Sequence, residues 1–153
     1  TFAENARQKA LYYAGACDMI TVAEDSGLEI DALGGEPGVH SARFGGFVGG
    51  YPRKFEIIYE RLRECRPPNS AARFVCALAV ARDRHIVFEA RGVVEGHIAD
   101  GPRGRGGFGY DPIFYYPPFG KTLAEVSAEQ KAQVSHRGQA FGQLRQFLER
   151  QGG

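Results

Sequence analysis

The amino-acid sequence predicts an α/β fold, and three stretches carry that prediction. Apolar residues at positions 55, 58, 59 and 62 have the i, i+3, i+4, i+7 spacing of an amphipathic helix. The run 72–81 is apolar on both faces, as in a central strand covered on each side. Residues 86–94 follow as a second strand, in which Glu89 and Arg91 begin to alternate outward. At 153 residues the chain has the size of one domain with a real core.

The first predicted element is a helix over 2–16. Thr1 and Glu4 have the spacing of a capping box at its entrance. Its apolar stripe consists of Phe2, Ala6, Ala10 and Tyr13. A strand is predicted over 19–24, and glycine-rich turns surround a short strand over 28–31. Because proteins seldom begin on the cap of their first helix, we expect a further segment ahead of Thr1.

The remaining elements follow in chain order. The helix around position 58 begins near Pro52, and a loop is expected over 66–70. A short turn at 82–84 makes the two long strands a hairpin. After them come a glycine- and arginine-rich loop over 101–109, a strand over 113–116, a short helix capped by Ser127, and a final helix whose apolar face is Phe141, Leu144 and Leu148.

Composition excludes several classes of protein. A net charge of +1 gives no general attraction to nucleic acid or to a membrane surface. No apolar run approaches the roughly 18 residues of a membrane span. The three cysteines are odd in number and lack CxxC spacing, so neither a disulfide framework nor a zinc site is indicated. A reducing, cytoplasmic compartment is expected.

The first candidate site is the segment Glu24-Asp25-Ser26-Gly27, where an apolar strand is expected to run into a glycine turn. Carboxylates at a strand end hold hard cations through oxygen ligands or accept a proton from an attacking water. The competing interpretation is a solvated turn in which Asp25 caps backbone amides.

The second candidate site is Gly106–Pro112. Its glycines allow close approach of the backbone to a ligand, Phe108 and Tyr110 offer flat faces for a base, and Asp111 is suited to accept hydrogen bonds from a purine edge. In one alternative the aromatic side chains simply return to the core. In another, Arg103–Phe108 is a small arginine-glycine segment that binds RNA, although one short copy in a neutral domain is a weak signal.

The third candidate site combines Lys131 with His136 and Arg137, which follow Ser135. A cation, an imidazole and a guanidinium this close in sequence suit a phosphate or a carbonyl-bearing base. The alternative is an ordinary helix entrance, with Ser135 as the N-cap and exposed charges beyond it.

Read together, these segments resemble the inosine triphosphate pyrophosphatase family, which acts on non-canonical purine nucleoside triphosphates. The resemblance spans nearly the whole chain in ordered motifs. They are Thr1–Ala6 with Lys9, Glu24–Leu28, Asp31–Gly35, Pro37–Phe44, Gly106–Phe114, Lys131 and Ser135–Ala140. The resemblance implies a mixed, curved sheet flanked by helices, two lobes with a central substrate cleft, and a homodimer.

The resemblance also implies an activity and residues for it. The activity is Mg²⁺-dependent attack of water between the α- and β-phosphates of ITP, dITP or XTP. Asp25 matches the family's catalytic acid, taken as water-activating base and metal ligand. The positions that match substrate contacts are Ser26, Phe108, Gly109, Tyr110, Asp111, Lys131, His136 and Arg137. Lys9 and Arg43 are expected to reach the phosphates.

Keto-purine selectivity has a physical rationale. The 6-keto group of inosine accepts hydrogen bonds where the amino group of adenine donates, so donors such as Arg137 and His136 favour keto bases. Adenine would leave these donors buried without an acceptor, and the cost of unpaired donors disfavours its binding.

The sequence departs from the family pattern at its start. The family begins with a strand, a phosphate-binding loop and an acidic metal ligand, and none of these stands ahead of Thr1. Two other functions therefore stay open, a purine-nucleotide-binding protein without catalysis and an RNA-binding module. Hydrolysis that requires Mg²⁺ separates the enzyme from both.

Overall fold

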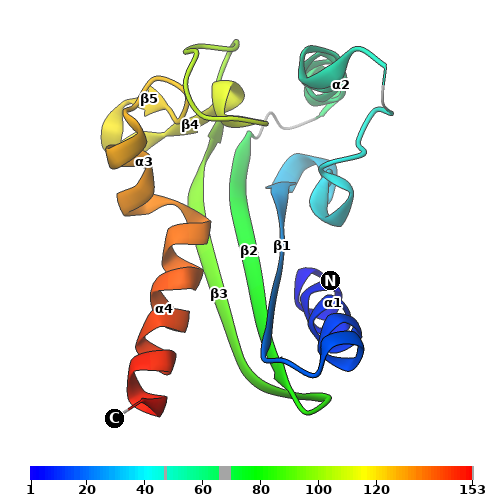
Figure 1. Ribbon diagram of the computed structural model, residues 1–153. Coiled ribbons are helices and arrows are strands. Elements are labelled where there is room, and N and C mark those ends of the chain that lie inside the picture. The colour runs from blue at the N-terminus through cyan, green and yellow to red at the C-terminus, as the bar shows by residue number, and fades with distance from the viewer. Residues whose placement is uncertain (47, 66–69, 153) are drawn as a thin grey trace. The chain divides into compact units, whose positions relative to one another are not determined.

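Strand β2 (Ala71–Arg82) is the central element of the fold because both of its faces are buried. The computed structural model describes residues 1–46, 48–65 and 70–152 (Figure 1). The loop expected over 66–70 lies outside the described residues except for Ser70. Along β2, Val75 to Ala81 are all less than 5% exposed. The prediction of an apolar strand covered on both sides is confirmed.

The α/β class is also confirmed. Five strands form one sheet in the order β1-β2-β3-β4-β5, with β1 at Thr21–Ile30, β3 at His85–Ile98, β4 at Phe114–Tyr116 and β5 at Lys121–Thr122. The pairs β3–β4 and β4–β5 are antiparallel. Helices are α1 (Phe2–Cys17), α2 (Gly50–Glu64), α3 (Ala128–Val134) and α4 (His136–Gln151). No helix in the described part of the chain is long and apolar enough to cross a membrane.

The described residues form two compact units that share the long strands. Unit 1 comprises 1–26, 75–93 and 134–153, and unit 2 comprises 27–74 and 94–133. Strands β1, β2 and β3 each contribute residues to both units. Each unit has its own apolar core.

In unit 1, α1 and α4 cover opposite faces of β2 (Figure 1). The odd-numbered residues Val75 to Ala81 pack against Phe2, Ala6, Ala10 and Ala14 of α1. The even-numbered Cys76, Leu78 and Val80 pack against Ala140 and Leu144 of α4. This division follows from the two-residue period of a strand, which sends successive side chains to opposite faces.

Two helix stripes differ from the sequence prediction. In α1, Ala14 is buried and Tyr13 is exposed. In α4, the buried positions are Ala140 and Leu144, with Phe147 packed beside them, whereas Phe141 and Leu148 are exposed. The reason in α4 is steric: the small side chain of Ala140 lets the helix approach the strand, and this sets which face is turned inward.

In unit 2, α2 packs on a core formed by this unit's portions of β1, β2 and β3 and by β4. The rings of Phe74 and Phe114 contact each other in this core, tilted by 35° with centroids 4.5 Å apart. The other buried members include Leu28, Ile30, Phe55, Ile58, Tyr110, Ile113 and Leu123. The predicted amphipathic helix is therefore present, and its apolar face holds it to the sheet.

Candidate functional site

The acidic segment lies inside a strand and not in a turn. β1 runs without interruption from Thr21 to Ile30, so Glu24 to Gly27 are all extended. The predicted break between two short strands is wrong, and so is the alternative of a solvated turn capped by Asp25. Pairing of β1 with β2 overrides the turn preference of Asp-Ser-Gly, because an extended segment beside a buried strand satisfies its backbone groups in the ladder.

The strand geometry separates the two carboxylates. Successive side chains of a strand point to opposite faces, and the contacts of the two residues agree with this. Asp25 contacts α1 through Asn5 and Lys9, while Glu24 contacts α4 through Arg137. Glu24 and Asp25 therefore do not form one shared cation site, and Asp25 is the carboxylate available on the α1 face of β1.

Asp25 is held by two side chains from successive turns of α1. The Lys9 Nζ lies 2.9 Å from Oδ1, and the Asn5 Nδ2 donates to Oδ2 at 3.0 Å. Residues four apart share one helix face, and the capping box of Thr1 and Glu4 fixes where the helix begins. Asn5 was not predicted as a site residue. Its signal in the sequence was the i, i+4 spacing from Lys9.

On the opposite face of β1, Glu24 is the centre of a polar cluster. Its Oε1 accepts from the Arg137 Nε at 3.1 Å and lies 3.1 Å from Nη2. Its Oε2 accepts from the Ser26 hydroxyl and lies 3.6 Å from the Cys76 Sγ. Burial raises the pKa of the Cys76 thiol to about 11, so this cysteine is a neutral neighbour of the carboxylate.

His136 and Arg137 begin α4, where Ser135 is the N-cap. The Ser135 hydroxyl accepts from the Gly138 N–H at 2.9 Å, as predicted. His136 is buried, whereas the alternative of an ordinary helix entrance expected exposed charges beyond Ser135. The helix start approaches β3 closely at Gly92, where an added Cβ would lie 1.9 Å from the carbonyl oxygen of His136.

In unit 2, the loop 106–111 is organised around the buried carboxylate of Asp111. Its Oδ2 accepts from the Phe108 N–H at 2.9 Å and pairs with Lys131 of α3. The loop can fold over this carboxylate because position 107 is glycine, with φ of 65° and with Oδ2 2.1 Å from where a Cβ would be. The structure thus brings together Asp111 of the second predicted segment and Lys131 of the third.

The two aromatic residues of this loop have different environments. Phe108 is 63% exposed, and the Lys131 Nζ lies 4.1 Å from its ring centroid. Tyr110 is 4% exposed and packs against Tyr51 and Phe55. Burial raises the pKa of Tyr110 above its ordinary value. Phe108 therefore offers an aromatic surface to a ligand, whereas the ring of Tyr110 belongs to the core.

A buried lysine that the sequence did not single out supports the segment carrying Arg43. Lys54 of α2 is 5% exposed and donates to the carbonyl oxygens of Ser41 and Ala42. The Tyr110 hydroxyl also donates to the Ser41 carbonyl, at 2.6 Å. Burial lowers the pKa of Lys54 from its usual value. Arg43 itself is exposed at the end of this fixed segment.

The arginine-glycine segment is an ordered part of unit 2. The Arg103 N–H donates to the Pro112 carbonyl at 2.9 Å, and the Thr122 hydroxyl donates to the Arg103 carbonyl at 2.7 Å. At Gly104 an added Cβ would lie 2.4 Å from the backbone of Ala124. These contacts fix the backbone of the segment within unit 2.

The donor atoms of unit 1 fit a metal ion only in part. Among the described residues, no group of three or more His, Cys, Asp and Glu side chains is placed to hold a metal ion. Mg²⁺ commonly takes one or two carboxylates from a protein and completes its octahedron with water and phosphate oxygens. Asp25 therefore fits a magnesium ion that is shared with a phosphate ligand.

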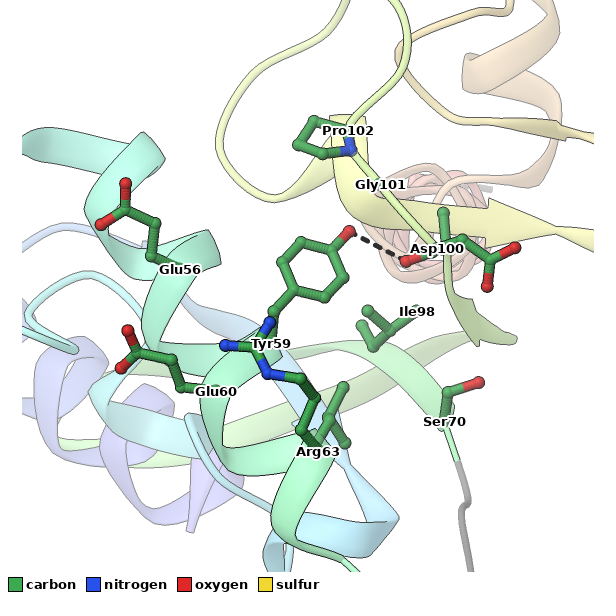
Figure 2. Close-up of a pocket in the computed structure, with 11 residues that line it drawn as sticks. Glu56, Tyr59, Glu60, Arg63, Ser70, Ile98, Asp100, Gly101 and Pro102 are labelled. Carbon is green, nitrogen blue, oxygen red and sulfur yellow. Dashed lines mark hydrogen bonds between the residues drawn. The ribbon is translucent and has the colours of Figure 1, made fainter.

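A cavity of about 700 Å³ in unit 2 contains none of the predicted site residues (Figure 2). At its centre the Tyr59 hydroxyl donates to the Ala99 carbonyl at 2.8 Å. Its lining carries three carboxylates, those of Glu56, Glu60 and Asp100, and one guanidinium, that of Arg63. Burial raises the pKa of Tyr59 to about 12, so its hydroxyl is a neutral donor. With more carboxylates than cations in its lining, this cavity is poorly suited to a triphosphate.

Comparison with known proteins supports the predicted resemblance. A family model described as the Ham1 family matches residues 1–147. A Thermus thermophilus protein named dITP/XTP pyrophosphatase is 50% identical over 149 residues, which are 97% of this chain and 70% of that protein. A protein of the same name from Dictyoglomus thermophilum is 45% identical over 150 residues, 97% of this chain and 73% of that protein.

Solved structures agree with the sequence comparison. The Staphylococcus aureus Ham1 protein is 42% identical with a TM-score of 0.92, over 99% of this chain and 78% of that chain. A HAM1 protein from Coxiella burnetii is 39% identical with a TM-score of 0.94, over 98% of this chain and 77% of that chain. The family model and the solved structures agree, and this chain belongs to the Ham1 family.

Proposed function

We propose that this protein hydrolyses ITP, dITP and XTP to the monophosphate and pyrophosphate. The observation that carries the proposal is the Asp25–Lys9 pair at 2.9 Å, found in a chain 50% identical to a protein named dITP/XTP pyrophosphatase. A carboxylate beside a fixed cation is suited to hydrolysis of a phosphoanhydride, in which a proton must be removed and negative charge must be neutralised.

In the proposed reaction, water attacks at the bond that joins the α- and β-phosphates, and Asp25 accepts a proton from that water. The bond between the two phosphates breaks, and pyrophosphate leaves. Lys9 keeps the Asp25 carboxylate in place and is close enough to contribute positive charge to the phosphates. Mg²⁺ is the proposed cofactor, held by Asp25 together with phosphate oxygens, and when bound it would neutralise phosphate charge and align the phosphates.

Each unit carries its own set of groups suited to a purine nucleotide. In unit 2, the exposed ring of Phe108 is suited to stack on a purine, and the Gly109 backbone, Asp111 and Lys131 line the same loop. Tyr110 supports this loop from the core. In unit 1, Arg137 and His136 are the proposed donors to a 6-keto oxygen, and Ser26 is linked to Arg137 through Glu24.

Two further properties are part of the proposal. No disulfide joins Cys17, Cys65 and Cys76, which suits the proposed reducing, cytoplasmic location. The protein is proposed to act as a homodimer, and sedimentation analysis of the purified protein would distinguish a dimer from a monomer.

The first test is pyrophosphate release by the purified protein with ITP, XTP, GTP and ATP, each with and without Mg²⁺. We expect release from ITP and XTP with Mg²⁺ and little release from ATP, because adenine presents a donor where the keto bases present an acceptor. Equal rates with ATP and ITP would exclude the proposed base selectivity. Tight binding of ITP without any release would instead indicate a nucleotide-binding protein without catalysis.

A further inference from the structure

We propose that Glu24 is a positioning residue that orients Arg137 for selection of the keto base. This inference rests on the proposed function, and it gives a role to the second carboxylate of the Glu24-Asp25 pair. The carrying observation is that a side chain of β1 meets the first turn of α4, 113 positions later in the chain, through two guanidinium nitrogens.

The geometry of the pair restricts how the guanidinium is oriented. Both Nε and Nη2 of Arg137 lie 3.1 Å from the same oxygen, Oε1 of Glu24. Contacts through two nitrogens of a planar guanidinium restrain its plane more than a single contact does. The Glu24 side chain is 27% exposed and the Arg137 side chain is 42% exposed, so the carboxylate is the more shielded partner.

The carboxylate is itself held from its other oxygen. Oε2 accepts from the Ser26 hydroxyl and lies close to the Cys76 thiol. Ser26 stands two residues along the strand and therefore shares its face with Glu24. Glu24 is thus a fixed acceptor, and Arg137 is the longer and more flexible partner that it orders.

The backbone that carries Arg137 is fixed independently of Glu24. The Gln139 side-chain amide accepts from the Val93 N–H at 3.1 Å and donates to the Val93 carbonyl at 2.9 Å. Gly92 lets the carbonyl of His136 approach β3, and Ser135 caps the helix. Because the helix start is held by these contacts, removal of the Glu24 charge is expected to release the Arg137 side chain while the helix stays in place.

The placement of Glu24 on the face opposite to Asp25 predicts a separation of effects. Loss of the Glu24 charge should weaken selection of the base and leave proton transfer at Asp25 largely intact. A residue that merely supported the fold would instead change all substrates alike.

The test is the Glu24→Gln variant, assayed with ITP and ATP. We expect kcat/KM for ITP to fall about tenfold because KM rises, while kcat changes by no more than about twofold. Hydrolysis of ATP should be nearly unchanged, so the preference for ITP over ATP should also fall about tenfold. Glu24→Asp, which keeps the charge, should retain most of the preference. The matched control is Glu89→Gln, because Glu89 also pairs with an arginine of the same unit, Arg7, at 2.6 Å. This variant should leave kcat/KM for both ITP and ATP unchanged.

A second measurement does not depend on activity. The Arg137 Nε–H signal in a ¹⁵N spectrum, assigned by its loss in Arg137→Lys, should exchange slowly with water in the nucleotide-free protein and rapidly in Glu24→Gln. Rapid exchange in the wild-type protein would overturn the pairing even if Glu24→Gln failed to fold. An unchanged preference in folded Glu24→Gln would overturn the positioning role alone, whereas a wild-type protein without preference for ITP would overturn the proposed function.

Discussion

At the scale of single residues, the most informative contacts are those of Asp25. Its two oxygens are occupied by different partners, Lys9 at 2.9 Å and Asn5 at 3.0 Å. Because each oxygen has its own partner, the rotation of the carboxylate is fixed. A carboxylate restrained in this way is preorganised to accept a proton from a water bound beside it, because little rearrangement is needed during the reaction.

We therefore expect Asp25→Asn to lower kcat for ITP by about 100-fold or more, because the amide has the same shape but accepts no proton at neutral pH. Nucleotide affinity should change little. Pyrophosphate release and equilibrium binding of ITP measure the two effects. Asp83→Asn is the control, since Asp83 lies in the β2–β3 turn with φ of 49°, a conformation that Asn also tolerates. Near-normal turnover by Asp25→Asn would remove Asp25 from the mechanism.

At the scale of elements, the contact between β3 and the start of α4 determines where His136 and Arg137 lie. Gln139 bonds to both backbone groups of Val93, and Gln143 donates to the Arg91 carbonyl at 2.8 Å. These bonds attach the helix to a strand at the point where the absence of a side chain at Gly92 leaves room. The close packing at Gly92 and the hydrogen bonds of Gln139 and Gln143 therefore fix the same position of α4 along β3.

Gly92→Ala should destabilise the protein by about 1–3 kcal/mol, because the new Cβ would overlap the His136 carbonyl and nearby backbone. Thermal unfolding measures this effect. Gly142→Ala is a matched control on the exposed side of α4, where nothing lies within 4 Å of the added Cβ. That substitution should stabilise the helix by about 0.5–1 kcal/mol. If both variants had the same stability, the close approach at Gly92 would not be a constraint.

At the scale of the whole molecule, the stability of the fold comes from three apolar clusters. Each cluster lies within one unit and includes residues from distant parts of the sequence. No disulfide joins the three cysteines. Burial of apolar surface in these clusters is the main source of stability, and the proposed Mg²⁺ is expected to act in the reaction.

Removal of divalent metal with EDTA should consequently abolish hydrolysis of ITP and leave thermal unfolding of the nucleotide-free protein unchanged. Addition of Mg²⁺ in excess should restore the activity. A large fall in melting temperature with EDTA would show instead that a metal is part of the folded structure. Activity that persists in EDTA would exclude Mg²⁺ as the cofactor.

Sequence periodicity was sufficient for the helices, the long hairpin and the central strand, because these depend on local spacing and on the alternation of apolar residues. The ordered motifs were also sufficient for the family. Asp25, Lys131 and Asp111 are predicted as site residues because charged residues are conspicuous in glycine-rich or apolar surroundings. These features are local and can be read within a few residues.

Tertiary structure alone decided the remaining features. Pairing with β2 made β1 continuous through Gly27, and this placed Glu24 and Asp25 on opposite faces. Packing against the sheet selected Ala140 and Leu144 as the inner face of α4 and left Phe141 outside. The pair of Glu24 with Arg137 joins residues 113 positions apart. No local pattern encodes such a contact, because it exists only when strand pairing and helix packing have brought the two segments together.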